Sequence, residues 1–229
     1  MMANSAGVGR RGGARRRFHF EPLDFDKYAG SFRDPGWCID RRHVNLLFGL
    51  LTAHPFRHAL EIGCYDGGST SAFVEALERG AGMRLTLCDV HFRERIRRMV
   101  AASPRRSAID LREEASCRVI GPQYDVVLVD RDHRLPTVAE ELYGLPRFNT
   151  ETVLMHDVAA TRAGYTGCEG ADLLRRAFQG RRGYHYIEDC RRREGEGTHR
   201  GFAVATRNAR VRELAQHLFA HYSALSAGA

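Results

Sequence analysis

Two apolar runs of this sequence end in side chains that can bind a metal ion or accept a proton. Asp130 closes the run YDVVLVD, and His156 and Asp157 close the run TVLMHD. His133 follows Asp130 by three residues, in the segment DRDH. Two carboxylates and an imidazole can hold a divalent cation and leave coordination positions for water and substrate. If the two runs are neighbouring strands of a parallel sheet, these side chains meet at one edge and predict a metal site.

Each of these side chains also has a plainer structural interpretation. Asp130 can cap the turn after its strand while Asp157 pairs with a nearby arginine. His133 can face solvent from its loop, and Asp132 can orient it or act as a base itself. His156 is either a ligand, which favours a softer ion than Mg²⁺, or part of the pocket wall.

The segment HALEIGCYDGGSTS, residues 58–71, predicts a strand, a glycine-rich turn and the start of a helix. Glycines let the backbone approach a ligand where a Cβ would block it. Backbone N–H groups at a helix start can bind the polar end of a ligand. Ser69 and Thr70 are residue types that favour helix N-caps. Residues 58–71 therefore predict a ligand-binding corner.

Two acidic residues indicate what kind of ligand this corner binds. Glu61 lies at the end of the first strand and directs a carboxylate at the turn, which suits a cationic or hydroxyl-bearing ligand. Asp89 ends the next apolar run, MRLTLCD. A carboxylate at the tip of the neighbouring strand can accept hydrogen bonds from ribose hydroxyls.

LEIGCYDGGST followed by LTLCD resembles the cofactor site of class I S-adenosylmethionine-dependent methyltransferases. The carboxylates that end the fourth and fifth strands resemble those of metal-dependent small-molecule O-methyltransferases, of the catechol, macrolide-sugar and cephalosporin-modifying types. The resemblance covers about residues 59–204. It implies S-adenosylmethionine and a divalent metal as cofactors, with Mg²⁺ expected and Mn²⁺ or another transition metal as alternatives. The implied reaction is O-methylation of a small-molecule hydroxyl.

Carried over by position, the resemblance implies a role for each matching residue. The cofactor-binding set is Glu61, Gly63, Tyr65, Gly67, Gly68, Ser69, Asp89, Ser116 and Asp130, with Ser116 near the adenine. The metal set is Asp130, His156 and Asp157, although an acidic residue is more usual at position 156. The base, three residues after the first ligand, is a lysine in the catechol type and a histidine in the sugar-modifying relatives. Because Lys27 is the sole lysine of the sequence, His133 is the expected catalytic base.

The composition fits a cytoplasmic, soluble protein with one α/β domain. The sequence is 229 residues long and 43% hydrophobic, and no apolar run approaches the ~20 residues that span a bilayer. Six scattered cysteines without a C-x-x-C pair favour reduced thiols. The net charge of +7, with arginine clusters at residues 10–17 and 191–193, raises the question of nucleic acid. Because no RNA-binding module accompanies the clusters, a nucleic-acid partner is disfavoured.

The chain divides into a basic tail (1–17) expected to be disordered, an aromatic-rich leader with the first helix (18–56), and a methyltransferase domain (57–229). The leader can pack on the domain, form a lid, or pair with a second subunit in a homo-oligomer. Strands are expected at residues 59–62, 84–89, 108–111, 124–130, 152–157, 184–190 and 201–207. Helices are expected at 42–54, 69–79, 91–103, 137–143, 171–178 and 209–225.

Strands that alternate with helices predict a Rossmann-like, doubly wound sheet, mostly parallel, with helices on both faces. The resemblance implies seven strands, the last antiparallel. An antibiotic or other natural-product sugar, a polyketide or a phenol would each suit such an enzyme as substrate. The alternatives are a metal-free methyltransferase, and an RNA-binding protein or RNA methyltransferase that uses the basic tail.

Overall fold

The computed structural model describes residues 20–33, 38–131, 133–147, 149–190 and 200–225. The expected basic tail, Trp37 of the leader, Asp132 and the arginine cluster 191–193 lie outside these residues. Within the described part of the chain, no helix is both long enough and apolar enough to cross a membrane.

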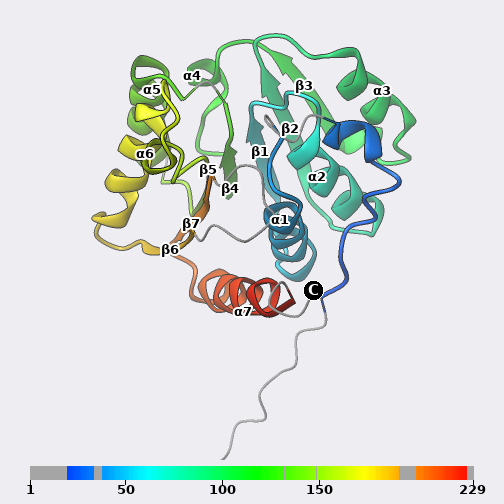
Figure 1. The fold of residues 1–229 in the computed structure, drawn as a ribbon. Helices are drawn as coiled ribbons and strands as arrows, with labels where there is room; N and C mark the ends of the chain where they lie inside the picture. The colour runs from blue at the N-terminus through cyan, green and yellow to red at the C-terminus, as the bar shows by residue number, and fades with distance from the viewer. Residues whose placement is uncertain (1–19, 34–37, 132, 148, 191–199, 226–229) are drawn as a thin grey trace, which may run out of the picture.

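Seven strands form one sheet in the order β3-β2-β1-β4-β5-β7-β6 (Figure 1). Neighbouring strands are parallel except that β7 is antiparallel to both β5 and β6. This confirms the expected doubly wound sheet with an antiparallel last strand. The strands are β1 (His58–Ile62), β2 (Arg84–Asp89), β3 (Ile109–Glu113), β4 (Val126–Val129), β5 (Thr152–His156), β6 (His185–Asp189) and β7 (Phe202–Thr206).

Helices cover both faces of this sheet (Figure 1). Side chains of α1, α2, α3 and α7 share one apolar core with the sheet, and those of α4, α5 and α6 share the other. The helices are α1 (Arg41–Ala53), α2 (Gly68–Glu78), α3 (Glu94–Ala102), α4 (Ser116–Val119), α5 (Leu135–Arg147), α6 (Glu169–Gln179) and α7 (Ala209–Leu225). Short 3₁₀ turns are η1 (Ala29–Phe32), η2 (Arg106–Ala108) and η3 (Thr161–Ala163).

The central strand β4 shows why the sheet requires continuous apolar runs. Val126 and Leu128 belong to the core beneath α1, α2 and α7, whereas Val127 and Val129 belong to the core beneath α5 and α6. All four side chains are buried. Successive side chains of a strand point to opposite faces, so a strand covered on both faces is apolar at every position.

The functional residues gather at the carboxyl edge of the sheet. The strand order reverses between β1 and β4, which is the position where open α/β sheets bind ligands. The five parallel strands β1 to β5 all end at this edge. Because β7 is antiparallel, it begins there, with Phe202 paired to His156 at the end of β5.

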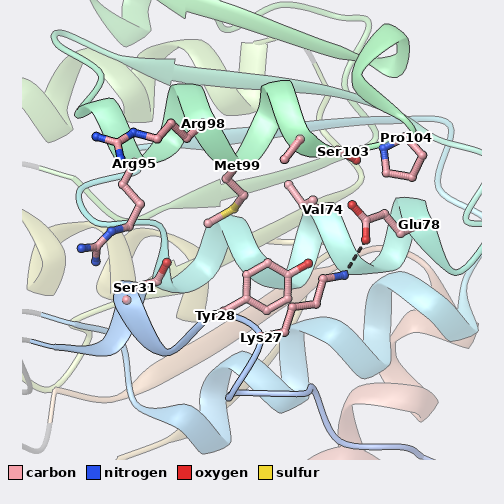
Figure 2. Close-up of a pocket in the computed structure, with 12 residues that line it drawn as sticks. Lys27, Tyr28, Ser31, Val74, Glu78, Arg95, Arg98, Met99, Ser103 and Pro104 are labelled. Carbon is pink, nitrogen blue, oxygen red and sulfur yellow. Dashed lines mark hydrogen bonds and ion pairs between the residues drawn. The ribbon is translucent and has the colours of Figure 1, made fainter.

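The described part of the leader packs on the domain. Leu23 and Tyr28 belong to the core that α1 and α2 share. Lys27 pairs with Glu75 and Glu78 of α2 at 2.6 and 2.5 Å. Figure 2 shows the Lys27–Glu78 contact beside a cavity of about 420 Å³ that lies between the leader, α2 and α3. A lid or a subunit contact by the leader stays a prediction.

Candidate active site

The turn between β1 and α2 is built on glycines with left-handed backbone angles. Gly63 has φ +85° and Gly67 has φ +88°. The N–H of Gly63 donates to the carbonyl of Cys88 at 2.9 Å. A Cβ on Gly63 would collide with the carbonyl oxygen of Asp130. Only glycine therefore lets the turn pass this close to the end of β4.

Glu61 lies fully buried beneath this turn and accepts a hydrogen bond from the hydroxyl of Ser69. Burial raises the pKa of Glu61 to about 8, against the opposing effect of that hydrogen bond. The expectation that Ser69 or Thr70 caps α2 is wrong. The helix begins at Gly68, after Gly67 has turned the chain, and the Ser69 hydroxyl bonds to the buried carboxyl instead.

Asp89, at the end of β2, holds the glycine turn in place. Its Oδ2 atom accepts the backbone N–H groups of Cys64 and Tyr65 at 2.8 and 3.4 Å. Tyr65 is partly exposed, and the guanidinium of Arg93 lies 3.8 Å from the centroid of its ring. The contact of Asp89 with a ribose stays a prediction.

Ser116 is the first residue of α4 and is buried. Its hydroxyl donates to Glu141 at 2.8 Å and accepts a hydrogen bond from Arg131 at 2.9 Å. Arg131 lines a cavity at the carboxyl edge of the sheet, so Ser116 is connected to that cavity through this guanidinium. The position of Ser116 near an adenine stays a prediction.

Asp130, His156 and Asp157 converge where β4 and β5 end. Nδ1 of His156 lies 2.8 Å from Oδ1 of Asp130 and 3.3 Å from Oδ1 of Asp157. One potential ligand atom from each residue lies within 4.8 Å of the other two. Burial alone lowers the pKa of His156, but the charges of the two carboxylates outweigh it and raise the pKa to about 9. The imidazolium of His156 therefore compensates part of the negative charge of the two carboxylates.

His133 joins this cluster through Asp157. Its Nε2 atom lies 2.8 Å from Oδ2 of Asp157, and its side chain is only 11% exposed. Burial raises the pKa of Asp157, but the charge of His156 and the hydrogen bond from His133 outweigh it and hold the pKa well below its usual range. His133 is thus mostly buried and paired rather than directed at solvent.

A buried histidine of α1 lies behind the cluster. The ring of His43 stands edge-on to that of His156, with 6.3 Å between centroids, and stacks on Phe202 at 5.5 Å. Its ring nitrogens lie 3.4 Å from Asp40 and 3.6 Å from Asp189. Burial lowers the pKa of His43 to about 4, so the ring is neutral at neutral pH. The sequence offered one signal for His43, because it places an imidazole inside the apolar stripe of a helix.

A cavity of about 990 Å³ opens above the cluster and the glycine turn. On the turn side it is lined by Gly63, Tyr65, Gly68, Ser69 and Asp89. At the ends of β4 and β5 it is lined by Asp130, His133 and Asp157. The other predicted site residues, Glu61, Gly67, Ser116 and His156, are buried behind this lining.

Sequence reasoning missed several further residues that line the cavity, among them Arg131, Arg134, Tyr165 and Arg200. Arg131 had a signal, because it directly follows Asp130. Arg200 precedes β7, and only the antiparallel direction of that strand brings its start to this edge. Its guanidinium lies 3.7 Å from Oδ2 of Asp157. The alternative in which Asp157 pairs with an arginine is thus present alongside its contact with His133.

No family model matches the sequence, and no curated protein matches it. The structure resembles TomG, an O-methyltransferase from Streptomyces achromogenes involved in tomaymycin synthesis and solved with S-adenosylmethionine. The TM-score is 0.64 at 20% identity, over 81% of this chain and 90% of that one. The structure also resembles cofactor-bound Rv0187 from MTB, with a TM-score of 0.60 at 18% identity, over 82% of this chain and 98% of that one.

The O-methyltransferase from Bacillus cereus, solved with S-adenosylhomocysteine, gives a TM-score of 0.59 at 16% identity, over 80% of this chain and 88% of that one. At these identities the similarity concerns the arrangement of helices and strands. The chain has the fold of the class I S-adenosylmethionine-dependent O-methyltransferases.

Proposed function

We propose that this protein transfers a methyl group from S-adenosylmethionine to a hydroxyl of a small molecule, with a divalent cation at Asp130, His156 and Asp157. The observation that supports this proposal is the convergence of those three residues and His133 beside the glycine turn. They lie at the carboxyl edge of the sheet, where ligands bind in this architecture. The solved neighbours that contain S-adenosylmethionine or S-adenosylhomocysteine support the choice of cofactor.

S-adenosylmethionine would supply an already activated methyl group, so the main task of the protein is to position the reactants. Glu61 and the backbone N–H groups of the turn would bind the amino-acid end. Asp89 would accept the ribose hydroxyls, and Ser116 would lie near the adenine. Each of these groups borders the turn or is joined by a hydrogen bond to a residue that lines the cavity.

The donor set fits a divalent cation. Two carboxylates and an imidazole offer ligand atoms within 4.8 Å of one another, and Asp130 and Asp157 face the cavity. When bound, such a cation lowers the pKa of a substrate hydroxyl and fixes its direction. His156 must lose its Nδ1 proton to act as a ligand. An imidazolium and a cation therefore exclude each other at this position.

His133 is positioned to remove the proton of the substrate hydroxyl. Asp157 accepts the N–H of its Nε2 atom, which leaves Nδ1 as the proton acceptor. The two oxygens of Asp157 face different histidines, Oδ2 toward His133 and Oδ1 toward His156. One carboxylate thus orients the base and belongs to the metal set.

A metal-free methyltransferase is the second candidate, and one observation favours it. The positive charges of His156 and Arg200 already compensate Asp130 and Asp157. In that case His133 and Asp157 would act as a base and its orienting carboxylate without a cation.

The test is a calorimetric titration with S-adenosylmethionine, with Mg²⁺ or with EDTA, followed by Mn²⁺ titration of the S-adenosylhomocysteine complex. We expect cofactor binding in both buffers and one Mn²⁺ site that is lost in Asp130→Asn. Asp66→Asn is the matched control, because Asp66 lines the same cavity but pairs with Arg93 at 2.8 Å. Cofactor binding without Mn²⁺ binding would select the metal-free candidate. RNA binding without cofactor binding would select an RNA-binding protein.

A further inference from the structure

A second cavity, of about 420 Å³, lies on the outer side of the glycine turn, between the leader, α2 and α3. Among the described residues, it shares no lining residue with the 990 Å³ cavity of the candidate active site. Ser31 and Met99 line it and also pack against the turn, because a Cβ on Gly67 would meet them at 3.3 and 3.0 Å. Its volume is in the range of small-molecule sites. A ligand here would therefore contact the back of the turn without entering the predicted cofactor space.

The middle of this cavity is apolar. Tyr28, Val74 and Met99 lie between its two ends (Figure 2), and Ala102 completes this part of the lining. Removal of apolar ligand surface from water is favourable and needs no particular direction of approach. The middle of the cavity therefore suits the hydrocarbon part of a small molecule.

Three cationic side chains and one carboxylate line the cavity, namely Lys27, Arg95, Arg98 and Glu78. Lys27 pairs with Glu78 at 2.5 Å, and Arg98 pairs with Glu94 of its own helix at 3.2 Å. In the part of the chain that the structure describes, no carboxylate forms an ion pair with Arg95. The positive charge that remains to be compensated at this cavity is therefore that of Arg95.

The guanidinium of Arg95 is held in place by the leader. A Cβ on Gly30 would lie 3.2 Å from its Cζ atom, so the group packs against the backbone of η1. Its Nη1 atom is buried there and has no hydrogen-bond partner among the described residues, although the side chain as a whole is partly exposed. Figure 2 shows Arg95 and Arg98 toward one end of the cavity and the Lys27–Glu78 ion pair toward the other.

A guanidinium fixed in this way suits a carboxylate. It carries five N–H donors in a planar fork, and a carboxylate can accept two of them side by side. Partial burial of the Arg95 charge without a counterion costs free energy, which an anion beside the guanidinium offsets.

We propose that this cavity is a second ligand site, which binds a small organic carboxylate with an apolar body. The carboxylate lies at the guanidinium of Arg95, and the hydrocarbon part lies between Tyr28, Val74 and Met99. Glu78 at the opposite end disfavours a second anionic group on the ligand. The inference does not depend on methyl transfer, because the cavity is separate from the candidate active site.

The experiment uses the full chain and pairs of probes that differ in charge and little in shape. Dissociation constants of benzoate, hexanoate and octanoate, and of the corresponding amides, are measured by NMR titration. A charge-assisted hydrogen bond is worth about tenfold or more in affinity. We expect at least one carboxylate to bind about tenfold tighter than its amide, and we expect Arg95→Gln to remove that preference.

Arg97→Gln is the matched control, because it removes the same charge from the same helix, but Arg97 pairs with Glu113 at 2.6 Å outside the cavity lining. It should keep the preference for the carboxylate. Ala102→Phe tests the apolar part, since Ala102 is exposed and a larger side chain there can fill the cavity without entering the core. It should weaken the carboxylate and its amide alike.

Three outcomes would overturn the inference. The first is that no carboxylate binds, or that each binds no tighter than its amide. The second is a preference for the carboxylate that survives both Arg95→Gln and Ala102→Phe, because the probe then binds elsewhere. The third is displacement of the probe by S-adenosylhomocysteine, which would place the probe in the candidate active site.

Discussion

His133 and Asp157 join the loop after β4 to the end of β5, with Nε2 of the imidazole 2.8 Å from Oδ2 of the carboxylate. Asp157 has a left-handed backbone with φ +59°, a conformation that aspartate tolerates better than most residues. This angle turns the chain directly after β5. The Asp157 side chain therefore faces the loop of β4 instead of continuing the alternation of the strand.

Replacement of His133 by alanine should lower kcat by about 10²–10⁴-fold, which is the usual contribution of a positioned base. Binding of S-adenosylmethionine should be unchanged, because the proposed function places His133 at the substrate and not at the cofactor. Steady-state kinetics on a hydroxyl substrate and calorimetry with the cofactor measure the two effects. The acidic limb of the kcat–pH profile should disappear with the imidazole.

The same profile separates the other candidate bases. If the limb survives in His133→Ala but disappears in Asp132→Asn or His156→Ala, one of those residues is the base. If it survives in all three variants, no single side chain of this set carries the proton, and His133 has no catalytic role.

Replacement of Asp89 by alanine should weaken binding of S-adenosylmethionine by about 1–3 kcal/mol. It removes the predicted acceptor of the ribose hydroxyls and also the acceptor of the Cys64 N–H. Asp89→Asn keeps an acceptor oxygen for the turn and serves as the control for folding. Unchanged cofactor affinity in Asp89→Ala, measured by calorimetry, would remove Asp89 from the cofactor site.

Replacement of Gly63 by alanine should destabilise the fold by about 2–5 kcal/mol, because the left-handed backbone and a collision with Asp130 add up. Gly80 is a matched control: its φ is +94°, and a Cβ there has no neighbour within 4 Å. Gly80→Ala should cost only about 1–2 kcal/mol. If urea unfolding shows the same loss of unfolding free energy in Gly63→Ala and Gly80→Ala, the collision with Asp130 adds no destabilisation.

Binding of S-adenosylmethionine should release protons near pH 7, because the pKa of Glu61 is raised to about 8 by burial. The amino group of the cofactor favours the ionised carboxylate, so affinity should rise as the pH increases toward 8. Calorimetry in two buffers of different ionisation enthalpy measures the release. Glu61→Gln should abolish it and weaken binding about tenfold. If proton release persists in Glu61→Gln, the released proton comes from another group.

Stability should fall as the pH drops from about 6.5 to 4, in part because of His43. The folded pKa of about 4 lies below the unfolded value, so the unfolded state binds more protons in this window. The full difference between the folded and unfolded pKa of His43 contributes up to about 3 kcal/mol to the free energy of unfolding. The charged groups around the ring are Asp40 and Arg42 from the α1 side, Asp189 from β6 and His156 from β5.

His43→Asn isolates this contribution. Its free energy of unfolding in urea should change less between pH 7 and pH 5 than that of the wild type. An identical change in both proteins would show that His43 does not contribute to acid sensitivity.

The sequence by itself predicted the seven strands of the described sheet and the order of the longer helices, with strand ends within about two residues of those observed; the short helix α4 (Ser116–Val119) was not expected. Strands buried on both faces require continuous apolar runs, so β4 and β5 were recognisable, and the residues that follow them had to lie at the sheet edge. Gly63 and Gly67 marked the turn for the same kind of local reason, because only glycine adopts their backbone angles freely. The doubly wound sheet followed from this pattern and is confirmed.

Only the tertiary structure decided which of these side chains meet. The pairing of His156 with Asp130 and of His133 with Asp157 depends on the packing of two strands that are distant in sequence. Arg200 reaches the cavity because β7 runs antiparallel and therefore begins where β5 ends. Such contacts have no periodic signature in the sequence, since they are set by strand direction and loop packing rather than by local conformational preference.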